Sequence, residues 1–227
     1  MDSESSAIAP RSKHSRGVSL REFLGLMTIL MLTVGLVLTA LRLRTANQEL
    51  RSLQAEVGYL AETSQDQIAA SRIRNDVEPL TYRFRVRVPA TGFRVAYSSL
   101  WPKHSPGPAW FGAVPVPPGE STVTVRIHED PRDHRWKIST IIATPKKSDR
   151  MGTVLPSEHE QAFRGSHQVI RAGVGQETLA VDQSRSIRLL DERWLVGEEG
   201  LLLYGNREPE HDQIGIYAEL QPDRGPL

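Results

Sequence analysis

Two histidines and three acidic residues lie within seven consecutive residues of this 227-residue chain: His128, Glu129, Asp130, Asp133 and His134. Imidazole nitrogens and carboxylate oxygens are ligands that divalent metal ions use, so this composition could in principle support a metal site. The stretch lacks the HExxH spacing and any comparable spacing of ligands. Pro131 and Arg132 interrupt it, which is typical of a solvated turn. We therefore predict no metal ion here, and no cofactor.

Residues that could perform catalysis are scattered and form no recognisable motif. The chain contains no cysteine, which excludes disulfides, thiolate metal sites and cysteine nucleophiles. His159, His167 and His211 stand in polar segments, and no Gly-x-Ser-x-Gly motif is present. The Gly-Val-Gly at 173–175 lacks the third glycine of a dinucleotide-binding loop, and there is no phosphate-binding P-loop. The sequence therefore predicts a protein that is not an enzyme, with a membrane-tethered hydrolase as the least favoured alternative.

Arg83, Arg85 and Arg87 alternate with apolar residues in the segment TYRFRVRV, so they project from one face of a predicted strand. Such a stripe could contact an anionic lipid surface, a cell-wall polymer or an acidic partner. Alternatively, the charges only solubilise an exposed strand face and prevent edge pairing, which is the interpretation we favour. The chain as a whole holds 28 basic and 27 acidic residues, a balance that does not indicate nucleic-acid binding.

Aromatic side chains mark a second candidate surface. Trp101, Trp110 and Phe111 stand in or beside a proline-rich stretch that we predict to be a rigid, exposed loop. Exposed aromatic rings there could bind a glycan or a protein partner. The alternative, which the sequence does not exclude, is that these rings close one end of the folded domain.

A charge-free run from Phe23 to Leu41 predicts a helix that anchors the chain in a membrane. At about 1.5 Å per residue a helix of this length just spans the bilayer, so we predict one uncleaved transmembrane helix over 22–42, a signal-anchor. Its only polar side chains are threonines, which can bond back to their own helix. The short arm 1–21 is predicted to be disordered and cytoplasmic, which places the C-terminal domain outside the membrane.

Beyond the membrane, apolar residues recur at alternating spacings of three and four, as in a heptad seam: Leu43, Ala46, Leu50, Leu53, Val57 and Leu60. We predict a helical neck over 43–78, a short coiled coil that ends before Pro79. The neck is expected to pair with a second copy or with a partner helix through residues 43–60. The alternative is a lone helix that lies on its own β domain or on the membrane.

From residue 80 to residue 227, short alternating segments separated by proline and glycine predict a mainly β domain, an antiparallel sandwich or barrel. A brief helical turn is predicted over 158–164. The strands that we predict are 81–88, 93–100, 121–128, 136–144, 168–172, 178–181, 187–190, 201–204 and 214–220.

In its overall plan the chain resembles bacterial bitopic envelope proteins, such as cell-division and rod-shape scaffold proteins. We therefore expect a single-pass membrane-anchored, noncatalytic envelope scaffold or interaction protein, which contacts the lipid bilayer and an envelope protein or glycan. The alternative is a membrane-tethered carbohydrate- or cell-wall-binding module.

Overall fold

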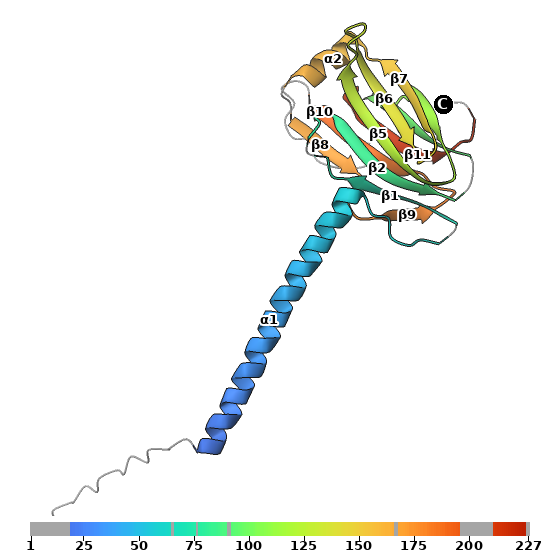
Figure 1. Cartoon of the computed structure of the whole chain (residues 1–227). Coiled ribbons are helices and arrows are strands. Elements are labelled where there is room, and N and C mark those ends of the chain that lie inside the picture. Colours follow the sequence, from blue (N-terminus) through green and yellow to red (C-terminus); the bar gives the residue numbers. More distant parts are fainter. Residues whose placement is uncertain are drawn as a thin grey trace, which may run out of the picture. The chain divides into compact units, whose positions relative to one another are not determined.

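The structure, a computed structural model, describes residues 19–64, 66–75, 77–89, 92–165, 168–195 and 211–225. It consists of one long N-terminal helix and a β domain built from two antiparallel sheets, with one short helix beside them (Figure 1). The chain divides after Leu50 into two compact units. This architecture confirms the predicted fold class, mainly β and sandwich-like behind an N-terminal helix.

The elements follow one another in a simple order, and their bounds are these: α1 Leu20–Val57, β1 Gln67–Ile73, β2 Thr81–Val88, β3 Phe93–Trp101, β4 Gly112–Val116, β5 Gly119–Glu129, β6 Trp136–Ala143, β7 Ser148–Val154, α2 Ser157–Arg164, β8 Gln168–Gly173, β9 Leu179–Asp182, β10 Ile187–Leu195 and β11 Gln213–Pro222.

Helix α1 starts at a capping box. The Glu22 backbone N–H donates to Ser19 Oγ at 3.2 Å, and the Ser19 backbone N–H donates to Glu22 Oε2 at 2.9 Å. Farther along, the Thr28, Thr33 and Thr39 hydroxyls donate to the carbonyl four residues earlier, at 2.8 to 2.9 Å. These bonds satisfy the only polar side chains in the apolar run, as predicted.

By length and composition α1 can cross a bilayer, and none of its most apolar stretch is buried against the rest of the protein. A soluble protein that uses such a helix in its core buries it, because exposed apolar surface is costly in water. The helix therefore fits a single membrane span or signal anchor.

The prediction that the helix continues to residue 78 is wrong, because α1 ends at Val57. Gly58 follows with φ = 65°, the left-handed conformation that glycine adopts most readily at a helix C-terminus. The Tyr59 backbone N–H then donates to the Gln54 carbonyl at 2.9 Å, which is the long bond of a Schellman motif. Glycine is also required by space, since a Cβ at residue 58 would lie 2.4 Å from Ile73 Cγ1.

The residues that we assigned to the second half of the neck form strand β1 instead. Ile68 and Ala70 point into the core, while the strand pairs with β2 on one side and β9 on the other. The domain therefore begins before residue 80, and Pro79 lies in the connection between β1 and β2. Pairing with two neighbouring strands outweighs the weak helical period of this segment.

The two sheets have the strand orders β7-β6-β5-β2-β1-β9 and β4-β3-β11-β10-β8, and every pairing is antiparallel. The predicted strands 121–128 and 136–144 form a hairpin, with Glu129 opposite Trp136. Strand β4 corrects the prediction that the proline-rich stretch 101–121 is a loop throughout. Strand β7 was not predicted, because SDRMGTV lacks alternating apolar residues. The predicted strand 201–204 lies outside the described residues.

The core lies between the facing sides of the two sheets. Its largest fully buried apolar side chains come from six strands and include Ile68, Phe84, Tyr97, Ile138, Ile142, Leu189, Leu190, Ile216 and Leu220. The predicted helical turn at 158–164 is confirmed as α2, whose Phe163 packs edge-on against Trp194 at 5.5 Å between ring centroids. The domain is thus held together without disulfides, as a chain without cysteine requires.

Candidate functional site

The predicted arginine stripe lies on the outer face of β2, and each of its members makes an ion pair within the domain. Arg87 Nη2 lies 2.7 Å from Glu120 Oε1, and Arg85 Nε lies 3.7 Å from the other oxygen of the same carboxylate. Arg83 is 3.7 Å from Glu78. Arg87 also donates to the Ala61 carbonyl at 3.2 Å, so it fastens the segment after α1 to the sheet. These contacts give the stripe a structural role within the domain. The part of our interpretation that concerned edge pairing is wrong, because β2 lies between β1 and β5 and has no free edge.

The two predicted tryptophans differ in their surroundings. Trp101 ends β3 and is only 7% exposed; its Nε1–H donates to the Ser105 carbonyl at 2.9 Å. The guanidinium of Arg193 stacks over its ring at 4.3 Å from the centroid and that of Arg188 at 5.1 Å. Trp110 is half-buried. The prediction of an exposed aromatic ring is therefore wrong for Trp101, whose faces are occupied by the protein itself.

The predicted pairing seam remains exposed along α1 as far as the helix extends. Leu43, Leu50, Leu53 and Val57 are between 53% and 61% exposed. Leu60 lies beyond the Schellman motif, outside the helix, and is only 6% exposed. Leu60 is therefore removed from the predicted seam, because the chain reverses at Gly58 and turns this side chain into the β domain.

The last turns of α1 contact the β domain through the helix face opposite the seam. Ala55 is buried there, and its carbonyl accepts a hydrogen bond from the Arg74 backbone N–H at 3.0 Å. Residues two positions apart on an α-helix point about 160° away from each other. Leu53 and Val57, on either side of Ala55, therefore point away from the β domain while Ala55 packs against it.

A buried carboxylate between the two sheets is the most unusual polar feature of the domain, and the sequence analysis missed it. The Glu192 side chain, on β10, has no exposed surface. The Tyr82 hydroxyl donates to Glu192 Oε2 at 2.6 Å, and Arg72 Nη2 and Arg171 Nε lie 3.3 and 3.5 Å from Oε1. Burial, followed by the charge of Glu192, raises the pKa of Tyr82 far above its ordinary value. The tyrosine therefore stays protonated and remains a donor to the carboxylate.

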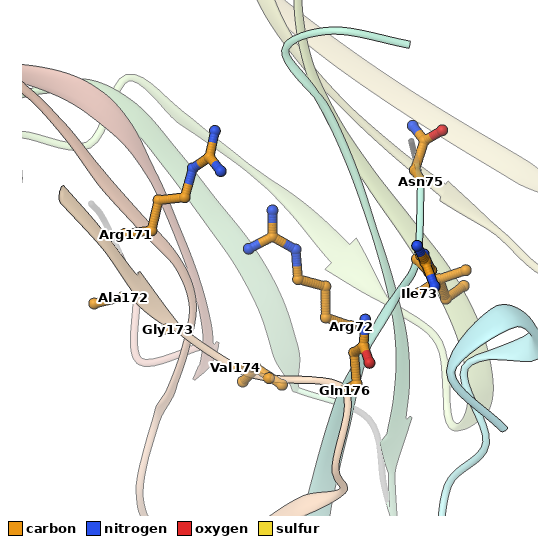
Figure 2. Close-up of a pocket in the computed structure, with 10 residues that line it drawn as sticks. Arg72, Ile73, Asn75, Arg171, Ala172, Gly173, Val174 and Gln176 are labelled. Carbon is orange, nitrogen blue, oxygen red and sulfur yellow. The ribbon is translucent and has the colours of Figure 1, made fainter. Parts of the chain in front are cut away.

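A cavity of about 390 Å³ opens beside this carboxylate. Figure 2 shows the Arg72 side chain, from β1, and the Arg171 side chain, from β8, in this hollow, with Gly173, Val174 and Gln176 along its wall. The Arg72 backbone N–H donates to the Gly175 carbonyl at 2.7 Å, which ties the wall to β1. Guanidinium groups, side-chain amides and backbone atoms therefore line the cavity beside the buried negative charge of Glu192.

Comparisons of this chain with protein-family models, with curated proteins and with solved structures find no match.

The predicted turn at 128–134 is held by its own ion pairs. Lys137 Nζ lies 2.7 Å from Asp130 and 2.8 Å from Asp133, and His134 Nδ1 lies 3.0 Å from Glu129. Among the residues that the structure describes, no group of three or more histidine, aspartate or glutamate side chains is placed to hold a metal ion. His167 lies outside those residues.

Simple alternation of apolar and polar residues could not have located Glu192. The predicted strand 187–190 ended before it, although the apolar residues Trp194 and Leu195 continue the strand pattern. The pairing of β10 with β11 shifts by one residue between Arg188 and Leu190, and this bulge changes which residues face the core. If burial simply alternated along β10 from Ile187, the Glu192 side chain would lie on the outer face of the sheet.

A second buried polar pair predicts a pH dependence of stability. Ser99 Oγ lies 2.7 Å from His159 Nδ1, and burial lowers the pKa of His159 below its ordinary value. The unfolded chain therefore binds a proton at this residue, near pH 6.5, before the folded chain does, so the folded domain loses stability as the pH falls through that value.

We expect His159→Asn to reduce this loss, because asparagine can bond to Ser99 and does not titrate. The measurement is urea unfolding of the full chain in nonionic detergent at about pH 7.5 and about pH 5.5. Burial also lowers the pKa of His128. His128 is present in both proteins, so its contribution to the pH dependence cancels in the comparison. An equal loss of stability in wild type and variant would contradict the assignment to His159.

Proposed function

We propose that this chain is a single-pass membrane-anchored, noncatalytic interaction protein that pairs with a second copy of itself through residues 43–57 of α1. In this proposal the short N-terminal arm is cytoplasmic and the β-sandwich stands outside the membrane. The observation that carries the proposal is the orientation of the seam: Leu53 and Val57 are exposed while Ala55, between them, packs against the β domain. This arrangement supports pairing over the alternative of a lone helix lying on its own domain.

The partner that fits the seam best is the same segment of a second copy. Two chains anchored in one bilayer by the same run of residues are parallel and have their seams at the same depth. In a parallel coiled coil, each a and d residue then meets its own counterpart in register. Within α1, Glu49 falls at a g position opposite Gln54 of the second chain, so no like charges face each other there.

Energetics explain why such pairing depends on the membrane. Each buried leucine contributes about 1.5 to 3 kcal/mol, and the seam has only three leucines, one alanine and one valine within α1. A coiled coil this short is marginal in solution. Anchoring both helices in one bilayer raises their effective concentration, which offsets part of the entropy lost on association.

The groups that line the cavity beside Glu192 also support a noncatalytic role. Arginines, amides and glycines line it, and these groups bind and orient a ligand rather than transfer protons or attack it. The proposed orientation is supported by Arg11, Lys13 and Arg16, which precede the helix.

Single cysteines introduced into this cysteine-free chain test the pairing directly. We expect Leu50→Cys and Leu53→Cys to form disulfide-linked dimers when isolated membranes holding the full chain are oxidised. The a and d positions of a parallel pair come close enough for the roughly 4.4 to 6.8 Å between Cα atoms that a disulfide requires.

Gln48→Cys is the matched control, because residue 48 lies on the face of α1 opposite the seam and is also exposed. We expect it to give little dimer under the same oxidation. Equal crosslinking at all three positions would indicate random collision in the membrane, and the absence of dimer at residues 50 and 53 would contradict self-pairing.

A further inference from the structure

We propose that the outer face of strands β5, β6 and β7 is a docking surface for an acidic segment of a partner protein, whose carboxylates pair with Arg126 and Arg150. This inference goes beyond the pairing of α1, because the surface belongs to the β domain and uses neither the seam nor the arginine stripe of β2. It rests on the convergence of the two arginines, on their charge balance and on the side chains around them.

Alternation along the strands places both arginines on the same face of the sheet. On β5, Ile127 is buried in the core, so Arg126 beside it points to the outer face. On β6, Ile142 is buried, so Ile141 points outward, and Arg150 of β7 lies opposite Ile141. The three strands lie side by side at one end of the six-stranded sheet (Figure 1).

The guanidinium groups of Arg126 and Arg150 approach each other over the middle strand, β6. Arg126 Nε donates to the hydroxyl of Ser139, its partner in register on β6, at 3.4 Å. Arg150 reaches across β6 from the other side, because its Nη2 lies 3.4 Å from Nε2 of His128 on β5. His128 and Arg126 are two residues apart on one face of β5, a separation of roughly 7 Å along a strand. The fold therefore brings two positive groups together.

His128 does not balance these charges. Burial lowers its pKa below the ordinary value, and the charges of Arg126 and Arg150 lower it further. The imidazole is therefore uncharged at neutral pH. Its Nε2 accepts the hydrogen bond from Arg150, since a guanidinium can only donate. The histidine thus orients Arg150 and leaves its positive charge in place.

No carboxylate in the part of the chain that the structure describes forms an ion pair with Arg126 or Arg150, whose contacts are with a serine and a histidine. Lys137, on the strand between them, differs in this respect. Its Nζ lies 2.7 Å from Asp130 and 2.8 Å from Asp133. Two like charges held near each other without an anion cost free energy, which a bound carboxylate recovers.

The number of unneutralised charges and their neighbours favour a protein segment over an anionic bilayer. Anionic lipid surfaces are recognised by clusters of about four to eight lysines and arginines, a larger set than this pair. Val154 on β7 is 42% exposed, and Ile141 is half-buried opposite Arg150. In protein interfaces, apolar side chains of this kind exclude water from arginine–carboxylate pairs. The planar guanidinium fork matches the two oxygens of an aspartate or glutamate.

The probe is a fluorescein-labelled peptide of alternating glutamate and valine, titrated into the full chain in phosphatidylcholine nanodiscs and followed by anisotropy. We expect saturable binding, and none by a peptide in which glutamine replaces glutamate. Arg126→Gln and Arg150→Gln are each expected to weaken the affinity by about tenfold, the loss of one charge-assisted pair of hydrogen bonds. Arg150→Lys is expected to bind with intermediate affinity, since lysine keeps the charge and lacks the fork.

Arg185→Gln is the matched control. It removes an equal charge from the exposed turn between β9 and β10, and β9 forms the opposite edge of the same sheet from β7. We expect this variant to bind the acidic peptide like wild type. Unchanged tryptophan emission shows that each variant is folded.

Sedimentation with phosphatidylglycerol vesicles tests the bilayer as the partner. We expect the nanodiscs that hold the chain to stay in the supernatant. Sedimentation of the wild type that Arg126→Gln abolishes would assign the face to an anionic bilayer and overturn the proposal. The proposal also fails if the acidic peptide shows no saturable binding, or if Arg185→Gln weakens it as much as Arg150→Gln. Both measurements work on a single chain, so their outcome is separate from that of the crosslinking test of α1.

Discussion

Replacing Arg72 by methionine is expected to destabilise the β-sandwich by about 3 kcal/mol. The substitution removes the closest positive charge to Glu192, whose side chain has no exposed surface. A buried carboxylate that loses its partner must be protonated or hydrated, and both cost free energy. The expected effect stays near the lower end of the range for broken buried pairs, because Arg171 Nε remains 3.5 Å from the same oxygen.

Urea unfolding monitored by tryptophan emission measures this effect in the full chain. All four tryptophans lie after Leu50, in the unit that contains the β domain, so their signal reports that unit and not the apolar run of α1. The second variant combines Arg72→Met with Glu192→Gln, which removes the buried charge and still accepts the Tyr82 hydrogen bond. We expect it to recover about 2 kcal/mol of the loss. A double variant no more stable than Arg72→Met would show that packing, rather than charge, accounts for the effect.

Gly173→Ala is the second substitution for which we expect a large loss, also about 3 kcal/mol. Gly173 ends β8 with φ = 104°, which side-chain-bearing residues rarely adopt. A Cβ there would lie 2.7 Å from the Leu189 carbonyl oxygen, a backbone atom that cannot move without disturbing β10. The free-energy cost of backbone strain at residue 173 and the cost of displacing β10 therefore add.

Gly175→Ala is the control for this prediction, since it makes the same chemical change two residues away. A Cβ at residue 175 has no atom within 4 Å. We expect a change of less than about 0.5 kcal/mol, measured by the same unfolding experiment. Equal losses for the two variants would mean that the segment 173–175 tolerates no side chain anywhere, and the explanation from φ and the Leu189 carbonyl would then be wrong.

The sequence predicted most of the elements but not all of their limits. Strands such as 81–88 and 121–128 alternate apolar and polar residues so regularly that only one face can be buried, and both were found where predicted. The segment 67–73 has no such alternation, and its strand forms through pairing with β2 and β9. Hydrogen bonds between strands distant in sequence are not visible in local spacing, which explains why a helix was predicted there.

Some features of the candidate sites could likewise be predicted from the sequence, and others could not. That Leu43, Leu50, Leu53 and Val57 share one face of α1 follows from heptad spacing alone. The burial of Trp101 does not, because it depends on Arg188 and Arg193, which come from a strand far along the chain. Glu192 was missed for a related reason: a β-bulge, which no periodicity reveals, turns it toward the core.

By itself, the sequence determined that this protein has an apolar N-terminal helix and a β domain without disulfides. An α-helix satisfies its backbone and threonine hydroxyls within one segment, so composition and length suffice to predict it. Only the tertiary structure decided where the helix stops, which of its faces meets the β domain, and that two arginines and a tyrosine surround one buried carboxylate. Each of these depends on side chains far apart in the chain, whose meeting is governed by packing and pairing rather than by local pattern.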